Sequence, residues 1–203
     1  MMGKGLLFVV SGPSGTGKGT ICKELLARTN VSLSVSMTTR KARNGEVDGL
    51  NYYFVSRKEF EDTIAQDGFL EYAEVYGNYY GTPQKAVLSK LEQGRDVVLE
   101  IDIQGALKIK EVYPKGIFIF ILPPSMMELR KRITGRGSES PDAIDIRLGE
   151  ALKEVSYIDK YDYCVVNDEV HKAVEKIIAI MNAEHSRVSE DIYSLIENYK
   201  EEL

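Results

Sequence analysis

The chain has 203 residues, of which 43% are hydrophobic and 28% are charged, and its formal net charge is −5. This length suits one ordinary domain, or one core that carries inserted lobes. The acidic balance argues against broad nucleic-acid binding, and no apolar stretch approaches the length that a membrane-spanning helix needs.

The N-terminal segment "MMGKGLLFVV" predicts a first strand, because its apolar run continues into a glycine-rich loop without the small-residue cleavage site of a signal peptide. Two cysteines, Cys22 and Cys164, stand in apolar surroundings without ligand-like spacing. We therefore expect buried, reduced thiols in a cytoplasmic protein that has neither a nucleic-acid nor a membrane partner. The sequence leaves both a monomer and a homodimer open.

Short apolar runs alternate with helical patterns along most of the chain. Segment 31–36 alternates polar and apolar residues, which suits a strand with one wetter face. Four other runs are apolar on both faces, as central strands of a covered parallel sheet are: 6–10, 97–101, 117–122 and 163–166. Strand–helix alternation of this kind predicts an α/β fold, with a parallel sheet and helices on both of its faces.

Two stretches interrupt this alternation. The first is polar and tyrosine-rich, with Gly77-Asn78 as a hairpin turn, and predicts an inserted α+β lobe. The second predicts a helical hairpin: Ser125 and Glu128 form a capping-box pattern, and Pro141 suits a first helical turn. A glycine-containing polar hinge between these helices is typical of a lid. The predicted division is a core of residues 1–35, 93–124 and 157–203, a lobe of residues 36–92 and a lid of residues 125–156.

The segment "GPSGTGKGT" matches the phosphate-binding pattern G-x-x-x-x-G-K, directly after a predicted strand and before a helical pattern. Its glycines let backbone N–H groups turn toward phosphate oxygens, and Lys18 adds a positive charge. A glycine-rich turn with an incidental lysine is the alternative, which this context disfavours. The pattern predicts nucleotide-phosphate binding by nine consecutive residues: Gly12, Pro13, Ser14, Gly15, Thr16, Gly17, Lys18, Gly19 and Thr20.

Gly19 stands where such loops usually carry a hydroxyl residue after the lysine. A glycine cannot ligate Mg²⁺ through a side chain, so we expect nucleotide phosphates and water to hold the metal. Thr20, one position later, still offers a hydroxyl to a phosphate. Glu100 is a further candidate, for the water shell of the metal. This arrangement fits a phosphotransferase that closes over two nucleotides better than a GTPase-like switch.

The lobe contains side chains that complement a monoester phosphate. Arg40 and Arg43 lie three residues apart, and Tyr52 and Tyr80 follow in the same lobe. Two guanidinium groups and two phenol hydroxyls are what a fixed phosphate monoester requires.

The same region also carries groups that suit guanine. Guanine presents N–H donors at its Watson–Crick edge, which an isolated carboxylate complements, and Glu71 and Asp102 supply carboxylates. Hydroxyls of Ser36 and Thr82 suit its O6 and N7 acceptors. Plainer alternatives exist: Thr82 as a helix cap, Ser36 as a strand end, and Glu71 and Tyr80 as solvated hairpin positions. For each residue taken alone the plainer role is favoured. Because groups that complement phosphate and guanine recur in one lobe, the set as a whole favours a GMP site.

The predicted lid carries a run of basic residues, "ELRKRITGR". Arg132 and Arg136 lie one helical turn apart, and Arg147 flanks an apolar stripe on the next helix. A solvated basic face is the alternative. If the lid closes, these three guanidinium groups converge on one point.

The chain resembles guanylate kinases over nearly its whole length. The resemblance rests on the phosphate loop, "TTRKARNGEVDGLNYYF", "GNYYGTP", "LEIDIQGA", "ILPPS", "RKRITGRG" and "VVND", in that order. It implies a P-loop kinase that transfers the γ-phosphoryl group of ATP to GMP, and also to dGMP, with Mg²⁺, giving ADP and GDP in purine nucleotide metabolism and GMP recycling. Gly19 is the departure, because many members carry Ser there, and "GKGT" resembles the loop of adenylate kinases instead.

The resemblance also assigns roles to residues. It implies that Arg132, Arg136 and Arg147 approach the transferring phosphates together with Lys18, and that Asn167 and Asp168 lie near the adenine of ATP. The residues that it implies for GMP are Ser36, Arg40, Arg43, Tyr52, Glu71, Tyr80, Thr82 and Asp102.

Two other classes of protein remain as alternatives. A guanylate-kinase-like binding module without activity would keep the lobe but would not need the phosphate loop, so Lys18 and the intact glycines disfavour it. A kinase for another nucleotide, such as an adenylate kinase, gives no reason for carboxylates at both Glu71 and Asp102.

Overall fold

The structure is a computed structural model that describes residues 4–75, 77–135, 141–188 and 190–202. Its core is a five-stranded parallel sheet in the order β2-β7-β1-β8-β9. The central strand β1 is buried along its whole length, as its unbroken apolar run predicts. The strands of this sheet are β1 (Leu7–Ser11), β2 (Ser32–Leu33), β7 (Val97–Glu100), β8 (Ile117–Leu122) and β9 (Tyr163–Val166).

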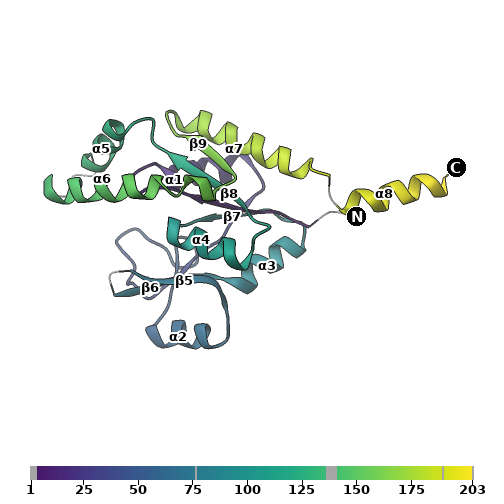
Figure 1. The fold of residues 1–203 in the computed structure, drawn as a ribbon. Coiled ribbons are helices and arrows are strands. Elements are labelled where there is room, and N and C mark those ends of the chain that lie inside the picture. Colours follow the sequence, from purple (N-terminus) through teal and green to yellow (C-terminus); the bar gives the residue numbers. More distant parts are fainter. Residues whose placement is uncertain (1–3, 76, 136–140, 189, 203) are drawn as a thin grey trace.

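Helices cover both faces of this sheet, which confirms the predicted fold class (Figure 1). On one face, α1 (Lys18–Arg28) and α7 (Val170–His185) pack against apolar side chains of β1 and β8. On the other face, α3 (Gln84–Glu92) and α4 (Ile103–Val112) pack against β1 and β7. The phosphate loop joins β1 to α1, so it lies at the carboxyl end of the central strand, where open α/β sheets bind ligands.

A second, mixed sheet lies below the core in Figure 1, in the strand order β4-β3-β6-β5. Helix α2 begins with a complete capping box between Ser56 and Glu59. The β5–β6 hairpin has Gly77 at φ +75° and a closing pair Val75–Asn78, so its turn lies one residue earlier than predicted. The elements are β3 (Met37–Thr38), β4 (Tyr53–Phe54), α2 (Arg57–Ala65), β5 (Phe69–Val75) and β6 (Asn78–Pro83).

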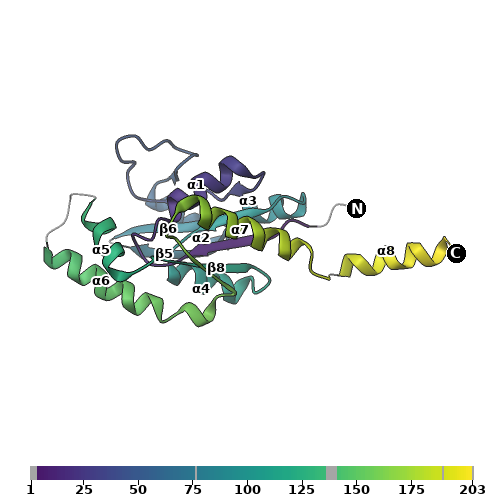
Figure 2. The same ribbon diagram turned by 90° about the horizontal axis from the view of Figure 1, so that it is seen from above.

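Helices α5 (Met126–Thr134) and α6 (Pro141–Val155) form the predicted helical hairpin, with Pro141 as the first residue of α6. Only half of the predicted capping box is present: the Ser125 hydroxyl accepts a hydrogen bond from the Glu128 N–H, but the Glu128 carboxylate pairs with Arg132 instead. A short 3₁₀ turn, η1 (Ile158–Lys160), leads into β9. Figures 1 and 2 show the last helix, α8 (Glu190–Glu201), extending beyond the rest of the molecule.

Two expectations about the core were wrong. The run 163–166 was predicted as a central strand, but β9 is an edge strand of the sheet. For the same reason Cys164 is exposed, whereas Cys22 is buried on α1. Segment 31–36 forms only the two-residue strand β2, which occupies the opposite edge. Among the described residues, no helix combines the length and the apolar character that crossing a membrane requires.

Candidate active site

The Lys18 ammonium group is held inside the phosphate loop. Lys18 is the first residue of α1, and its Nζ donates hydrogen bonds to the carbonyl oxygens of Gly12 at 2.6 Å and of Pro13 at 3.1 Å. Burial lowers the pKa of Lys18, while the carboxylate of Glu100 opposes this shift. A cation in this position neutralises negative charge on a phosphate that the loop binds.

Two glycines of the loop are required by its packing as well as by its backbone conformation. Gly17 has φ +91°, and a Cβ there would lie 2.5 Å from Nδ2 of Asn167. Gly15 has φ +89°, and a Cβ there would lie 3.0 Å from side-chain atoms of Leu129 and of Ile133 on α5. The loop is therefore enclosed by α5 and by the segment after β9.

That segment supplies the predicted adenine-side residues. The Nδ2 of Asn167 donates to the Thr16 carbonyl oxygen at 2.7 Å, and Asn167 is 2% exposed. Its Oδ1 is buried, and no hydrogen-bond partner for it exists in the described part of the chain. Asp168 is exposed, and its Oδ1 accepts a hydrogen bond from the Glu169 N–H. The free Oδ1 of Asn167 is an acceptor that suits an amino group such as that of adenine.

Two of the three predicted lid arginines contact the phosphate loop region. Arg132 donates to the carbonyl oxygens of Asn167 at 3.0 Å and of Thr16 at 3.4 Å. Arg147 Nη2 donates to Oγ of Ser14 at 2.7 Å. Arg136 lies outside the described residues. The structure thus brings the helical hairpin and the loop together through two guanidinium groups.

A cavity of about 340 Å³ lies between the phosphate loop and the mixed sheet. Nine predicted residues line it: Gly12, Ser14, Lys18, Ser36, Tyr52, Glu71, Tyr80, Glu100 and Asp102. Five further lining residues were not predicted: Ala73, Val75, Gly81, Ile101 and Glu154.

Glu71 and Asp102 lie close together at the start of α4. Oδ1 of Asp102 caps α4 by accepting a hydrogen bond from the Gly105 N–H at 2.7 Å. A Cβ at Gly105 would lie 3.2 Å from Oδ1 of Asp102 and 3.3 Å from Oε2 of Glu71. Burial raises the pKa of Glu71, the Thr82 hydrogen bond opposes the rise, and Asp102 adds to it. Two carboxylates so placed complement a ligand edge with adjacent N–H donors.

Thr82 does not line the cavity itself but holds one member of this pair, Glu71. Its hydroxyl donates to Oε1 of Glu71 at 2.7 Å, and the residue is 1% exposed. The alternative role as a helix cap is not found, because Pro83 precedes α3 and no side chain caps that helix. The sequence could not show this contact, because Glu71 and Thr82 become neighbours only through the β5–β6 pairing.

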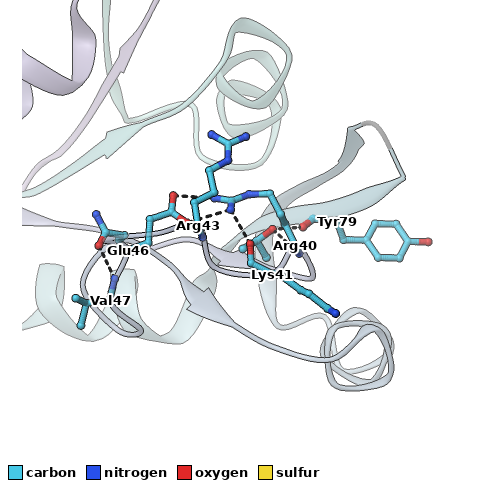
Figure 3. Close-up of polar contacts among 8 residues, drawn as sticks. Arg40, Lys41, Arg43, Glu46, Val47 and Tyr79 are labelled. Carbon is cyan, nitrogen blue, oxygen red and sulfur yellow. Dashed lines mark hydrogen bonds and ion pairs between the residues drawn. The ribbon is translucent and has the colours of Figure 1, made fainter. Parts of the chain in front are cut away.

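The predicted phosphate-binding residues form a second group in the lobe. The Tyr52 and Tyr80 rings pack edge to face with centroids 6.0 Å apart, and the Cζ of Arg40 lies 5.5 Å from the Tyr52 ring centroid. The guanidinium group of Arg40 pairs with Glu46, a residue that the sequence analysis did not single out (Figure 3). Arg43 is exposed, and its guanidinium group extends away from this pair in Figure 3.

The loop and its surroundings fit a metal ion that a nucleotide carries. A Cβ at Gly19 would lie 3.4 Å from Oε1 of Glu100, so this carboxylate faces the loop. Burial raises the pKa of Glu100 and the charge of Lys18 opposes this shift. Within the described ranges, no group of three or more His, Cys, Asp or Glu side chains is arranged to hold a metal ion. Mg²⁺ tolerates such a site, because it commonly keeps several water ligands beside substrate phosphates.

Comparisons with known proteins all point to one family. A family model described as guanylate kinase matches residues 4–184. A guanylate kinase of Clostridium tetani is 61% identical over 187 residues, covering 92% of this chain and 90% of that protein. One of Caldanaerobacter subterraneus is 58% identical, covering 94% of each. The crystal structure of guanylate kinase from Anaplasma phagocytophilum superposes with a TM-score of 0.76 at 38% identity, covering 93% of this chain and 90% of that one.

Proposed function

Because the chain belongs to the guanylate kinase family, we propose that the cavity beside the phosphate loop is where it transfers the γ-phosphoryl group of ATP to GMP. The chain is a nucleoside monophosphate kinase, and the products of its reaction are ADP and GDP. One observation carries the assignment to the cavity: the ammonium group of Lys18 and the carboxylates of Glu71 and Asp102 line the same cavity. The cavity therefore offers a cation for a phosphate and two acceptors for guanine.

The acceptor nucleotide is proposed to bind with its base against Glu71 and Asp102. Ser36 lines the cavity beside them, and Thr82 holds Glu71 in place through its hydrogen bond. The GMP phosphate is proposed to lie against Arg40, Arg43, Tyr52 and Tyr80. dGMP carries the same base and phosphate, so we include it as a substrate.

ATP is proposed to bind with its phosphates on residues 12–20 and its adenine beside Asn167 and Asp168. The buried, unpartnered Oδ1 of Asn167 supports this placement, because an amino group would satisfy it. Mg²⁺ would be held by the phosphates and water, with Glu100 in its water shell, and would neutralise charge on the phosphates. Arg132, Arg136 and Arg147 are proposed to approach the transferred group from the lid.

The chemistry follows from charge. The phosphate oxygen of GMP is already anionic at neutral pH, so no general base is needed. The residues of this chain align the two nucleotides and neutralise the charge of the transferred group. Water must be excluded, because it would otherwise accept the phosphoryl group from ATP. We therefore propose that residues 36–92 and 125–156 act as two lobes that close over the core.

We propose that the reaction takes place in the cytoplasm and serves purine nucleotide metabolism and GMP recycling. We propose that the chain performs this chemistry as a monomer or as a homodimer.

The test is a coupled assay of ADP release with GMP, dGMP, AMP, CMP and UMP as acceptors. We expect activity with GMP and dGMP, and little with the other three. The double variant Glu71→Gln, Asp102→Asn should lose most of its preference for GMP over AMP, because amides present donors where guanine also presents donors. An unchanged preference in this variant would contradict the base assignment, and activity with none of the acceptors would favour a binding module.

A further inference from the structure

The carboxylate of Glu46 grips the guanidinium group of Arg40 at two points. Nη1 and Nη2 of Arg40 donate to Oε2 at 3.0 Å and to Oε1 at 2.9 Å, and the Arg43 N–H donates to Oε2 at 2.7 Å (Figure 3). A two-point pair of this kind fixes the plane of the guanidinium group as well as its position. Glu46 also closes the turn from Arg43 to itself, since its N–H donates to the Arg43 carbonyl oxygen at 3.1 Å.

Arg40 is held from other directions too. Nη1 donates a second hydrogen bond to the Lys41 carbonyl oxygen at 2.7 Å. The Cζ lies 5.5 Å from the Tyr52 ring centroid and 5.8 Å from the Phe54 ring centroid. Its backbone N–H donates to Oγ1 of Thr38, at the end of β3, at 3.2 Å. The side chain of Arg40 is 14% exposed, so few of its rotamers remain open.

These contacts occupy one edge of the guanidinium group and leave another for a ligand. An arginine has five N–H donors in a rigid plane, and the Nη1–Nη2 edge is the one that Glu46 takes. Nε of Arg40 donates none of the hydrogen bonds described above, and a side-chain hydrogen bond with Tyr80 adds to the raised pKa of Arg40, so the Tyr80 hydroxyl lies beside the guanidinium group. The Nε–Nη2 edge therefore keeps N–H groups that can donate to phosphate oxygens beside Tyr80, while Glu46 stays bound.

The charge of Glu46 fits this supporting role. The Arg40 hydrogen bond, and then the Arg43 N–H, hold the pKa of the Glu46 carboxyl below its usual range, so it is ionised at neutral pH. The same pairing raises the pKa of Arg40. The ionised carboxylate of Glu46 binds the Nη1–Nη2 edge of Arg40, so it does not compete with a phosphate for the N–H donors of the Nε–Nη2 edge.

We propose that Glu46 is a positioning residue for the substrate phosphate: it holds the Arg40 guanidinium group and the Arg43 backbone so that the free edge of Arg40 faces the phosphate of GMP. This inference rests on the proposed function, because it assumes that Arg40 binds that phosphate. Glu46 does not line the cavity, so its proposed effect on the substrate is indirect and passes through Arg40 and Arg43.

The variant Glu46→Gln tests the proposal, because it keeps the size of the side chain but replaces one acceptor oxygen with a donor. We expect the KM for GMP to rise about tenfold or more, the cost typical of a lost hydrogen bond between charged groups. The kcat at saturating GMP and the KM for ATP should stay within about twofold. Guanosine, which lacks the phosphate, should bind as a competitive inhibitor with an unchanged inhibition constant.

Glu61→Gln is the matched control, because Glu61 pairs with Arg57 at 2.9 Å in the same lobe and Arg57 is not among the residues proposed to bind GMP. It should leave all four constants unchanged. Parallel loss of guanosine and GMP binding in Glu46→Gln would assign Glu46 to the folding of the lobe and overturn the proposal. A lower KM for GMP would show that Glu46 competes with the phosphate, and an unchanged KM would show that it has no part in binding; either result also overturns it.

Arg40→Lys separates this inference from the proposed function, because lysine keeps the charge but loses the two-point fork. If Arg40→Lys raises the KM for GMP and Glu46→Gln does not, only the role of Glu46 is wrong. If neither variant changes it, the phosphate site itself is wrong.

Discussion

The carboxylate of Glu71 must be ionised to accept hydrogen bonds from guanine, yet its surroundings oppose the charge. Burial raises its pKa above the usual value of 4.5, and nearby Asp102 raises it further. In the free protein a raised pKa means that Glu71 contributes stability below pH 4.5 and loses that contribution as the pH rises through its folded-state pKa. In the proposed complex GMP would reverse this preference, because its N–H donors would favour the charged form of Glu71.

The pH dependence of GMP binding should therefore report Glu71. We expect kcat/KM for GMP to fall as the pH decreases through the raised pKa, at a pH above 4.5, because protonated Glu71 loses an acceptor. Steady-state rates of the wild type and of Glu71→Gln between pH 4.5 and 8 measure this. Glu71→Gln should bind GMP weakly at every pH and lack this acidic fall. The same fall in both proteins would assign the titration to another group.

Residues of the site could be predicted from the sequence where they belong to one contiguous motif. Residues 12–20 form one loop, and their arrangement follows from the strand and helix on either side. The roles of Thr82 and Glu46 could not be predicted in this way. Thr82 reaches Glu71 across a strand pair, and Glu46 reaches Arg40 because the chain folds back after Arg43. These contacts depend on tertiary geometry that residue type and spacing do not determine.

At the scale of elements, α5 acts as a support for the phosphate loop. Leu129 and Ile133 contact the space beside Gly15, and Arg132 links the carbonyl oxygens of Thr16 and Asn167. The helix thus carries a cation that contacts both the loop and the segment after β9. In the proposed closure, movement of α5 would change the contacts of Arg132 without changing those between Glu71, Asp102 and their neighbours.

Arg132→Ala should separate catalysis from GMP binding. We expect kcat to fall about 10³-fold, as losses of arginines that stabilise transferred phosphoryl groups typically do, with little change in the dissociation constant of GMP. Steady-state kinetics measure kcat, and a GMP titration monitored by tyrosine fluorescence measures the dissociation constant. Lys131→Ala is the control, because Lys131 is the neighbouring cation on α5 and is exposed. Equal losses of kcat and of GMP affinity would count against a role on the transferred phosphate.

Four of the five core strands could be predicted because each is a single apolar run, and 117–122 and 163–166 match β8 and β9 residue for residue. The order of the strands in the sheet could not be predicted, because an edge strand and a central strand differ in their partner strands, which the local sequence does not reveal. β9 is a short apolar run like β8 but has only one partner strand among the described residues, so Cys164 is exposed. The two-residue strands β3 and β4 were missed for a related reason, since their partners lie outside any local window.

At the scale of the whole molecule, the cavity lies beside the phosphate loop, and α8 extends away from the rest of the molecule (Figure 2). The family model ends at residue 184, before α8 begins at Glu190. Helix α8 has exposed apolar side chains at Ile192, Tyr193, Ile196 and Tyr199. Among the residues that the structure describes, none that lines the cavity comes from this helix.

Deletion of residues 190–203 should therefore leave kcat and the KM for GMP within about twofold of the full chain, because tolerance to truncation follows from burial and contacts of the removed backbone. The melting temperature should also change little, since the two large core clusters are built from residues before 190. If the deletion lowers activity, the molecular mass of both proteins by light scattering identifies the cause. If activity falls and a dimer becomes a monomer, the apolar face of α8 builds an assembly that the site needs. If activity falls while the molecular mass per particle changes only by the deleted segment, α8 stabilises the core within one chain.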